Sequence, residues 1–331
     1  MNALLRLATG FYAPAGLRSR LSVFYFHRAL AQPDPLLPGE PDARTFDGIL
    51  GWIGAQFQVL DPLEACERLF AGTLPARPAV ITFDDGYRDN HAVALPLLRR
   101  HRMKAAFFVA TGYLDTGMMF NDRVIEAVRR CKVDSIRMPT LGGTAPRALP
   151  LSDLDQRRRA LDEIIDCIKF LPPDERLEQV ERLEHQCGDE GEQAAATMMM
   201  TPEQVVDLQR QGMQVGGHTR THPILRVLDD PEAVAEIAGG REDLKAILGE
   251  APALFAYPNG KRGRDYDLRD ERIVESAGFS YAFATDNAAA DRNCSRFAIP
   301  RFTPWDRSKL RFGARVIVNL RRSKRAPWAI V

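Results

Sequence analysis

Hydrophobic and polar residues form blocks along the chain that predict strands and helices in turn. Short apolar runs rich in β-branched and aromatic residues predict strands, and apolar residues spaced three or four apart predict helices. The predicted strands cover residues 21–26, 79–83, 105–110, 213–218, 253–257, 281–284 and 297–302, and the predicted helices cover 45–57, 61–70, 90–101, 201–212, 230–248 and 271–277. Such alternation favours an α/β fold with parallel strands and right-handed crossovers.

Capping signals mark the starts of several of these helices. Thr45 is the predicted N-cap of the first helix. Pro62 introduces the second helix at its first position, where a missing N–H costs nothing. Thr201, Pro202 and Gln204 together predict a capping box.

The pattern changes between about residues 115 and 200. Three strongly charged helical segments, 122–131, 152–170 and 173–185, follow one another, and we predict no strand between them. We interpret residues 115–200 as a helical insertion within a single domain that spans residues 1–331. A separate regulatory domain is the alternative.

Composition excludes some classes of protein. The 331 residues are 45% hydrophobic and 27% charged, as in ordinary globular proteins, and the net charge of +1 gives no overall field that favours nucleic acid. The five cysteines contain no CxxC pair, which argues against disulfides and against a zinc-thiolate site. We therefore expect a cytoplasmic protein without a nucleic-acid partner.

Neither end of the chain predicts a membrane-spanning helix. Residues 1–22 are interrupted by arginines, glycine and proline, so we predict no signal peptide, and no window reaches the ~18 to 20 apolar residues of a membrane span. Residues 311–331 form a basic C-terminal tail without acids. This tail is either solvated or in peripheral contact with the anionic face of the inner membrane.

Two short segments carry the candidate chemistry. Asp84 and Asp85 follow a predicted buried strand, and His218 and His222 follow another. Two imidazoles and one carboxylate are the usual ligands of a catalytic zinc site that keeps a position open for water. Asp85, His218 and His222 would be the ligands, and Asp84 would be left as a general base. Taken singly, the acids also suit a turn, and His218 suits a core or capping role.

These segments resemble the first two motifs of the polysaccharide deacetylase family, carbohydrate esterase family four. The residues concerned are Thr82-Phe83-Asp84-Asp85-Gly86 and His218-Thr219-Arg220-Thr221-His222-Pro223. The resemblance covers residues 21–115 and 201–305. It implies a distorted, incomplete (β/α) barrel, a divalent metal that is usually Zn²⁺, and removal of N-acetyl groups from sugars.

The resemblance also assigns roles. Asp84 would be the base, and Asp85, His218 and His222 would be the metal ligands. The backbone N–H of Tyr87 would bind the oxyanion that forms during amide hydrolysis.

The chain departs from the family in two places. The third motif, residues 255–260, carries Ala256 where the family has an arginine, and resembles a branch found in surface-glycan and exopolysaccharide biosynthesis. Arg301, at another predicted strand end, is our candidate for the missing guanidinium; a surface ion pair is the alternative. The family's last motif supplies a histidine acid near the C-terminus, but no histidine follows His222 in this chain. His27 is therefore our candidate for the catalytic acid, with a structural role as the alternative.

Other residues are weaker candidates. Tyr257 and Trp305 have aromatic faces that would stack on a sugar ring, although Tyr257 equally suits core packing. Asn121 or Asp122 is expected to cap a helix at the start of the insertion; the alternative is that residues 120–123 reach the mouth of the cleft.

The sequence thus predicts a metal-dependent hydrolase that removes N-acetyl groups from a sugar in cell-surface polysaccharide or glycolipid biosynthesis. Its partner would be an N-acetylated sugar or a lipid-linked glycan. A deformylase or another C–N amide hydrolase, and a degenerate glycan-binding member without activity, are the alternatives. Cobalt, nickel and iron fit the same ligands as zinc.

Overall fold

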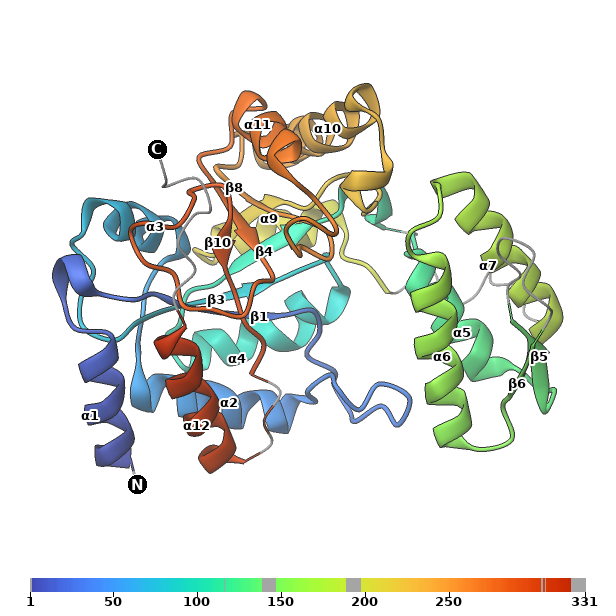
Figure 1. The fold of residues 1–331 in the computed structure, drawn as a ribbon, viewed down its shortest axis with the longest axis horizontal. Helices are drawn as coiled ribbons and strands as arrows, with labels where there is room; N and C mark the ends of the chain where they lie inside the picture. Colours follow the sequence, from blue (N-terminus) through green and yellow to red (C-terminus); the bar gives the residue numbers. More distant parts are fainter. Residues whose placement is uncertain are drawn as a thin grey trace.

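A parallel sheet that curls into a nearly closed barrel forms the centre of the molecule (Figure 1). The computed structural model describes residues 2–115, 117–138, 147–188, 198–304, 306 and 308–322. Strands follow the order β1-β3-β4-β7-β8-β9-β10, with β2 beside β3. Their bounds are β1 Ser22–Phe26, β2 Gln58–Val59, β3 Pro78–Phe83, β4 Ala106–Val109, β7 Gln214–Gly217, β8 Leu254–Ala256, β9 Tyr281–Ala284 and β10 Ile299–Pro300.

The two edges of this sheet meet beyond β10. Phe302 pairs with Phe24 of β1 in parallel register. The Tyr25 N–H donates to Phe302 O at 3.2 Å, and the Phe302 N–H donates to Val23 O at 3.0 Å. The expected distorted (β/α) barrel is confirmed.

Helices surround the barrel. They are α1 Asn2–Tyr12, α2 Ala43–Gln56, α3 Pro62–Ala71, α4 Leu95–Arg100, α9 Pro202–Arg210, α10 Asp230–Leu248, α11 Leu268–Ser276 and α12 Lys309–Arg321. A π-helical segment, Asn90–Ala94, precedes α4, and short 3₁₀ turns cover Gly16–Arg18, Thr111–Tyr113 and Leu225–Val227. The sequence pattern predicted neither α1 nor α12. Within the described residues, no helix combines the length and apolarity needed to cross a bilayer.

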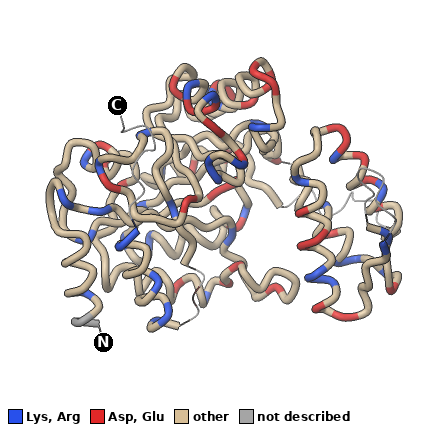
Figure 2. The backbone as a smooth tube through the Cα atoms, viewed as in Figure 1, with Lys and Arg blue, Asp and Glu red and all other residues tan. Residues whose placement is uncertain are grey.

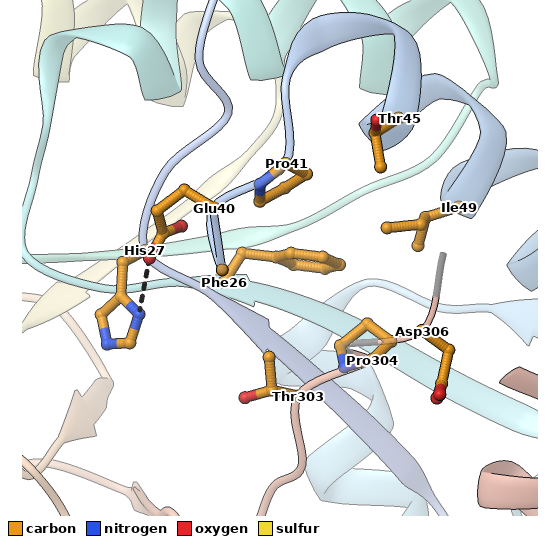
Figure 3. A pocket seen from close by; sticks show the side chains of 10 residues that line it. Phe26, His27, Glu40, Pro41, Thr45, Ile49, Thr303, Pro304 and Asp306 are labelled. Carbon is orange, nitrogen blue, oxygen red and sulfur yellow. Dashed lines mark ion pairs between the residues drawn. The ribbon is translucent and has the colours of Figure 1, made fainter. Parts of the chain in front are cut away.

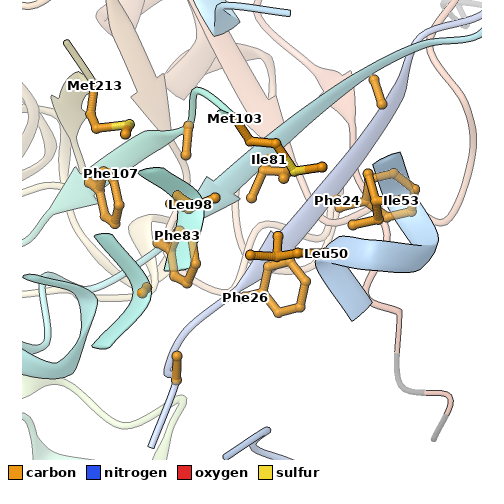
Figure 4. Packing of buried hydrophobic residues seen from close by; sticks show 14 of the residues in the cluster. Phe24, Phe26, Leu50, Ile53, Ile81, Phe83, Leu98, Met103, Phe107 and Met213 are labelled. Atoms are coloured by element: carbon orange, nitrogen blue, oxygen red, sulfur yellow. The ribbon is translucent and has the colours of Figure 1, made fainter. Parts of the chain in front are cut away.

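Both faces of the sheet are apolar, which explains the continuous apolar runs in the sequence. Phe24, Ile81 and Phe107 face outward, where Leu50 and Ile53 of α2 pack against the same cluster (Figure 4). Their neighbours along the strands, such as Val23, Val80 and Phe108, join a second buried cluster. Strands covered on both faces lose the polar alternation of a half-exposed sheet.

The described residues between 115 and 200 form a helical unit beside the barrel (Figure 1). It contains α5 Phe120–Arg130, α6 Leu154–Ile168 and α7 Pro173–Cys187, which share a buried cluster of their own. Two short antiparallel strands, β5 Ser135–Arg137 and β6 Ala148–Pro150, lie between α5 and α6. The prediction that no strand occurs in this segment was therefore wrong, because runs of three residues are too short to show a periodicity.

Helix starts were predicted with mixed success. Thr201 and Gln204 form both hydrogen bonds of the capping box. Thr45 is not the N-cap of α2: the helix begins at Ala43, and the Asp42 side chain accepts from the Thr45 N–H at 3.0 Å. The predicted cap lies three residues too late because the start of the helix was inferred from the first apolar residue of the pattern.

The corrected cap gives a test. Asp42→Ala leaves a helix N–H without its acceptor, so we expect a loss of about 1 kcal/mol in the free energy of unfolding. Thr45→Ala keeps the backbone N–H that Asp42 accepts and loses only the bond from its hydroxyl to the Asp42 carboxylate. Because alanine is also the better helix former, stability should change by less than about 0.5 kcal/mol. Urea unfolding of both variants measures the difference. Equal losses would contradict the assignment of Asp42.

Candidate metal and catalytic site

The ends of β3 and β7 bring Asp85, His218 and His222 together. Nε2 of His218 and Nε2 of His222 each lie 3.3 Å from Oδ1 of Asp85. One possible ligand atom from each residue lies within 4.8 Å of the others, so the group could hold a metal ion. Asp85 Oδ1 is buried and accepts no hydrogen bond of ordinary geometry from the described residues. A bound cation would satisfy a buried carboxylate oxygen in that state.

The backbone fixes the ring of His218 for this purpose. Its Nδ1 lies 2.7 Å from the carbonyl oxygen of Ala256 at the end of β8. A carbonyl only accepts, so Nδ1 carries the proton and Nε2 offers its lone pair toward Asp85. Such a carbonyl partner is usual behind a histidine that binds a metal. Ala256, which stands where the family has an arginine, thus supports the site through its backbone.

Burial and neighbouring charges set the protonation of the group. Burial lowers the pKa of His222 to about 4; Asp85 opposes this change, and the imidazoles of His218 and His27 add to it. Burial alone would raise the pKa of Asp85, but His222, His218 and His27 outweigh it and hold that pKa well below its usual range. At neutral pH Asp85 is therefore a carboxylate and His222 is a neutral imidazole, the forms that bind metals.

Unusual backbone conformations aim these side chains. Asp85, Thr219 and His222 have φ values of 80°, 66° and 52°, in the left-handed region that residues other than glycine rarely adopt. The turn at Asp85 lets two successive carboxylates, Asp84 and Asp85, serve the same side of the sheet. Strain of this kind gathers at functional sites.

The loop from His218 to His222 is held by its neighbours. Thr219 Oγ1 accepts from the His222 N–H at 3.0 Å, and Thr221 Oγ1 donates to Glu236 of α10 at 2.7 Å. Gly240 of α10 allows this close approach, since a Cβ there would lie 2.9 Å from Thr219 O. The two histidines therefore converge from a loop.

Arg301 directly follows β10, the last strand in the sheet order, and its side chain reaches Asp84 at the end of β3. Its Nη1 and Nη2 donate to Oδ1 and Oδ2 of Asp84 at 2.7 and 2.8 Å, and Nη1 also donates to Thr82 Oγ1 at 3.1 Å. Arg301 is fully buried, and its guanidinium carbon lies 5.0 Å from the centre of the Tyr25 ring. The alternative of a surface ion pair is wrong. The structure brings the guanidinium to the carboxylate that the sequence proposed as the base.

His27 lies at the carboxyl end of β1 and faces the same space. Its Nδ1 is 4.0 Å from Oε1 of Glu40, and its side chain is 38% exposed (Figure 3). The pKa of His27 is raised: burial opposes the charged form, but the carboxylates of Asp85, Glu40 and Asp84 outweigh burial. The environment thus favours a protonated imidazole.

Tyr87 is a buried residue that connects the barrel with the insertion. Its hydroxyl donates to the Asp122 carboxylate, with distances of 3.0 and 3.1 Å to the two oxygens, and the Arg28 guanidinium carbon lies 4.6 Å from the centre of its ring. Its backbone N–H donates to no acceptor among the described residues. Asp122 is at the third position of α5, where its carboxylate also accepts from the Met119 N–H. The N-cap of α5 is Met119, so the prediction that Asn121 or Asp122 is the cap was wrong.

Two predicted substrate contacts differ from their expectation. Tyr257 is fully buried, its hydroxyl donates to Phe297 O at 2.9 Å, and its ring stacks on Tyr266 with centroids 3.7 Å apart. This placement agrees with the core-packing alternative, so a substrate cannot reach Tyr257. Trp305 lies outside the described residues.

One pocket, of about 340 Å³, joins these groups. Asp84, Asp85, His218, His222 and His27 line its barrel side. Its other walls come from the insertion and from a loop before α2, and are formed by Leu37, Glu40, Phe120, Asn121, Asp122, Ile125, Ile165 and Lys169. Phe120, Asn121 and Asp122 therefore reach the cleft, which was the alternative to a capping role. Glu40 and the rest of the insertion wall were not predicted, because only the packing of separate segments brings them to the site.

Fold and site together define a (β/α)-barrel protein with the side chains of a hydrolase at its strand ends. The family model for polysaccharide deacetylase matches residues 71–166 and 181–282. YxkH of Bacillus subtilis (strain 168), a curated relative with the same family description, is 38% identical over 260 residues, which are 78% of this chain and 63% of the relative. The chain belongs to the polysaccharide deacetylase family. It spans less than two thirds of the length of that curated relative.

Solved structures share the fold. The deacetylase PplD of Streptococcus pyogenes is 18% identical with a TM-score of 0.56, and covers 86% of this chain and 92% of its own. IcaB from Ammonifex degensii is 19% identical with a TM-score of 0.57, and covers 92% and 98% respectively. At these identities the similarity is one of architecture.

The buried pair of Asp84 and Arg301 makes a sharp prediction. Arg301→Met leaves the Asp84 carboxylate buried and unpaired, so we expect a loss of about 3 to 5 kcal/mol in the free energy of unfolding. The double variant Asp84→Asn, Arg301→Met has no unpaired charge and should recover at least about half of that loss. Urea unfolding of the two single variants and the double variant gives the coupling energy. Additive losses would show that the pair is not coupled.

Proposed function

We propose that this protein is a metal-dependent hydrolase that removes N-acetyl groups from a sugar of a cell-surface polysaccharide or glycolipid. The observation that carries the proposal is the Asp85, His218 and His222 group beside Asp84, which Arg301 holds in place. A donor set of two imidazole nitrogens and one carboxylate oxygen fits catalytic zinc, and we propose Zn²⁺ as the ion. When bound, the ion would lower the pKa of its water and polarise the substrate carbonyl.

The residues of the chain supply the remaining chemistry. Asp84 takes a proton from the attacking water; each of its oxygens has a second lone pair free of Arg301. The Tyr87 N–H donates to the carbonyl oxygen as that oxygen becomes negative. His27 gives its proton to the nitrogen as the C–N bond breaks, which releases acetate and leaves a free amine on the sugar.

Activity of Asp84 variants tests this assignment. Asp84→Asn keeps the shape and the metal ligands but removes the base, so kcat on an N-acetylated oligosaccharide should fall by at least about a hundredfold. Zinc binding, measured by titration calorimetry, should remain. Asp85→Asn and His222→Gln should instead lose zinc binding, and stripped wild-type protein should regain activity with zinc. Full activity of Asp84→Asn would disprove the role of Asp84.

A substrate panel separates the alternative functions. N-formyl sugars and cyclic amides would reveal a deformylase or another amide hydrolase, since the same residues serve these bonds. A non-catalytic glycan binder has no use for a carboxylate held ready by a buried guanidinium, so the pair of Asp84 and Arg301 argues against it.

The setting of the reaction is part of the proposal. We infer an N-acetylated sugar or lipid-linked glycan as the substrate and a cytoplasmic site peripheral to the inner membrane. Residues 311–321 of the basic tail lie in α12 Lys309–Arg321, which packs beside α1, with Leu5 of α1 against Gly313.

The outer sides of these helices combine apolar and basic residues. Leu7, Phe11 and Leu310 are 71%, 78% and 67% exposed. Residues 2–22 and 308–322 contain eight arginines and lysines and no acid, and α1 and α12 show blue and no red in Figure 2. Such surfaces bind anionic bilayers.

Vesicle binding tests the membrane contact. The protein should co-sediment with phosphatidylglycerol vesicles at least about tenfold more than with phosphatidylcholine vesicles, because basic side chains attract anionic lipid. Leu7→Ser with Phe11→Ser should reduce binding about tenfold or more. Val234→Ser, at a 45% exposed site on α10, is the matched control and should bind like the wild type. Equal binding to both lipids would contradict the proposal.

A further inference from the structure

Both junctions of the insertion hold the loop that follows the metal ligand Asp85. Where the chain enters the insertion, Asp122 accepts the Tyr87 hydroxyl. Where the chain leaves it, the Met200 N–H donates to Gly86 O at 3.0 Å, and the Arg88 N–H donates to Met198 O at 2.8 Å. The loop is therefore clamped from two sides by one inserted segment.

The exit junction fixes the direction of the Tyr87 N–H. The carbonyl of Gly86 and the N–H of Tyr87 belong to one trans peptide, in which the two groups point to opposite sides. Because Met200 binds the carbonyl, the N–H must point away from Met200. Gly86 has a φ of 93°, which a side chain would strain, so this orientation depends on the glycine.

The entry junction fixes the side chain of the same residue. Tyr87 is 3% exposed and packs with Met119 and Met199, which flank the two junctions. The Arg28 guanidinium over its ring is itself held by Asp89, to which Arg28 Nε donates at 2.8 Å. The phenol has one described acceptor, Asp122, which is 2% exposed.

We propose that Asp122 is a positioning residue that, from the insertion, holds Tyr87 so that its N–H can serve as the oxyanion donor. This inference rests on the proposed deacetylase function. Asp122 does not touch the substrate in this role; it acts through Tyr87. The insertion is then part of the catalytic machinery, not an addition to it.

A purely structural role for Asp122 is the competing explanation. Its carboxylate also accepts from the Met119 N–H at the start of α5, as helix-capping acids do. Loss of that cap alone would lower stability without a specific effect on the loop from Asp85 to Arg88. The kinetics and the dynamics of the loop separate the two roles.

Four variants form the experiment. Tyr87→Phe removes the hydroxyl and keeps the ring, and Asp122→Leu removes the acceptor. Asp122→Asn keeps one acceptor oxygen and is the conservative rescue. Arg123→Gln is the matched control: it breaks the pair in which Arg123 donates to Glu184 at 2.8 and 2.6 Å, one residue away, inside the insertion.

Tyr87→Phe and Asp122→Leu should each lower kcat about ten- to a hundredfold with KM and zinc affinity unchanged, because a small misplacement of a transition-state donor is costly. The double variant should be no slower than the worse single variant, since both changes break one link. Asp122→Asn should stay within about threefold of wild type, and Arg123→Gln should match it. Wild-type kcat in Tyr87→Phe, or loss of zinc binding in Asp122→Leu, would overturn the proposal.

Hydrogen exchange gives a readout that needs no turnover. The amides of residues 84–90 should exchange faster in Tyr87→Phe and Asp122→Leu than in the wild type. In Arg123→Gln their exchange rates should equal those of the wild type. If the wild type hydrolyses no acetylated sugar but this exchange pattern appears, the proposed function fails and the clamp stands. If the exchange is unchanged in all variants, the clamp fails whatever the activity.

Discussion

The buried ion pair between Asp84 and Arg301 is the interaction on which the site depends. Both side chains are almost fully buried, and each oxygen of the carboxylate receives a guanidinium N–H. Such a pair fixes the orientation of the carboxylate, and removal of one partner costs several kcal/mol. The residues are 217 positions apart, so the Asp84 carboxylate is oriented only when the last strand has closed against the first. The geometry of the candidate site and the closure of the barrel are therefore one constraint.

Much of the fold and half of the site could be predicted from the sequence. Alternating strands and helices predicted an α/β fold with parallel strands, because buried parallel strands leave continuous apolar runs, and the family resemblance implied the barrel. Asp84, Asp85, His218 and His222 were found because each follows a strand, and the carboxyl ends of parallel strands meet at one edge. The same reasoning found Arg301, although the family motif places its arginine elsewhere. His27 remains a prediction that its position and raised pKa support.

The rest could not be read from local patterns. Asp122 and Glu40 reach the pocket only because the insertion and a distant loop pack against the barrel, and no spacing in the sequence encodes that packing. Tyr257 was a candidate substrate contact because of its residue type alone. In the structure its hydroxyl donates to Phe297 O and its ring stacks on Tyr266 in the core. The strands β5 and β6 were missed because three-residue runs carry no period, and Asp42 because the true cap precedes the apolar pattern.

The two junctions of the insertion have a consequence for how this chain can diverge. Residues 198–200 pair through the backbone with the loop from Asp85 to Arg88, and Asp122 accepts the Tyr87 hydroxyl through its side chain. An insertion transplanted from a relative would need both features at the same places, so it is not an exchangeable module. Ile125 and Lys169, which line the insertion wall of the pocket, take no part in either junction. Substitutions that reshape the pocket can therefore accumulate on that wall while the junctions stay fixed.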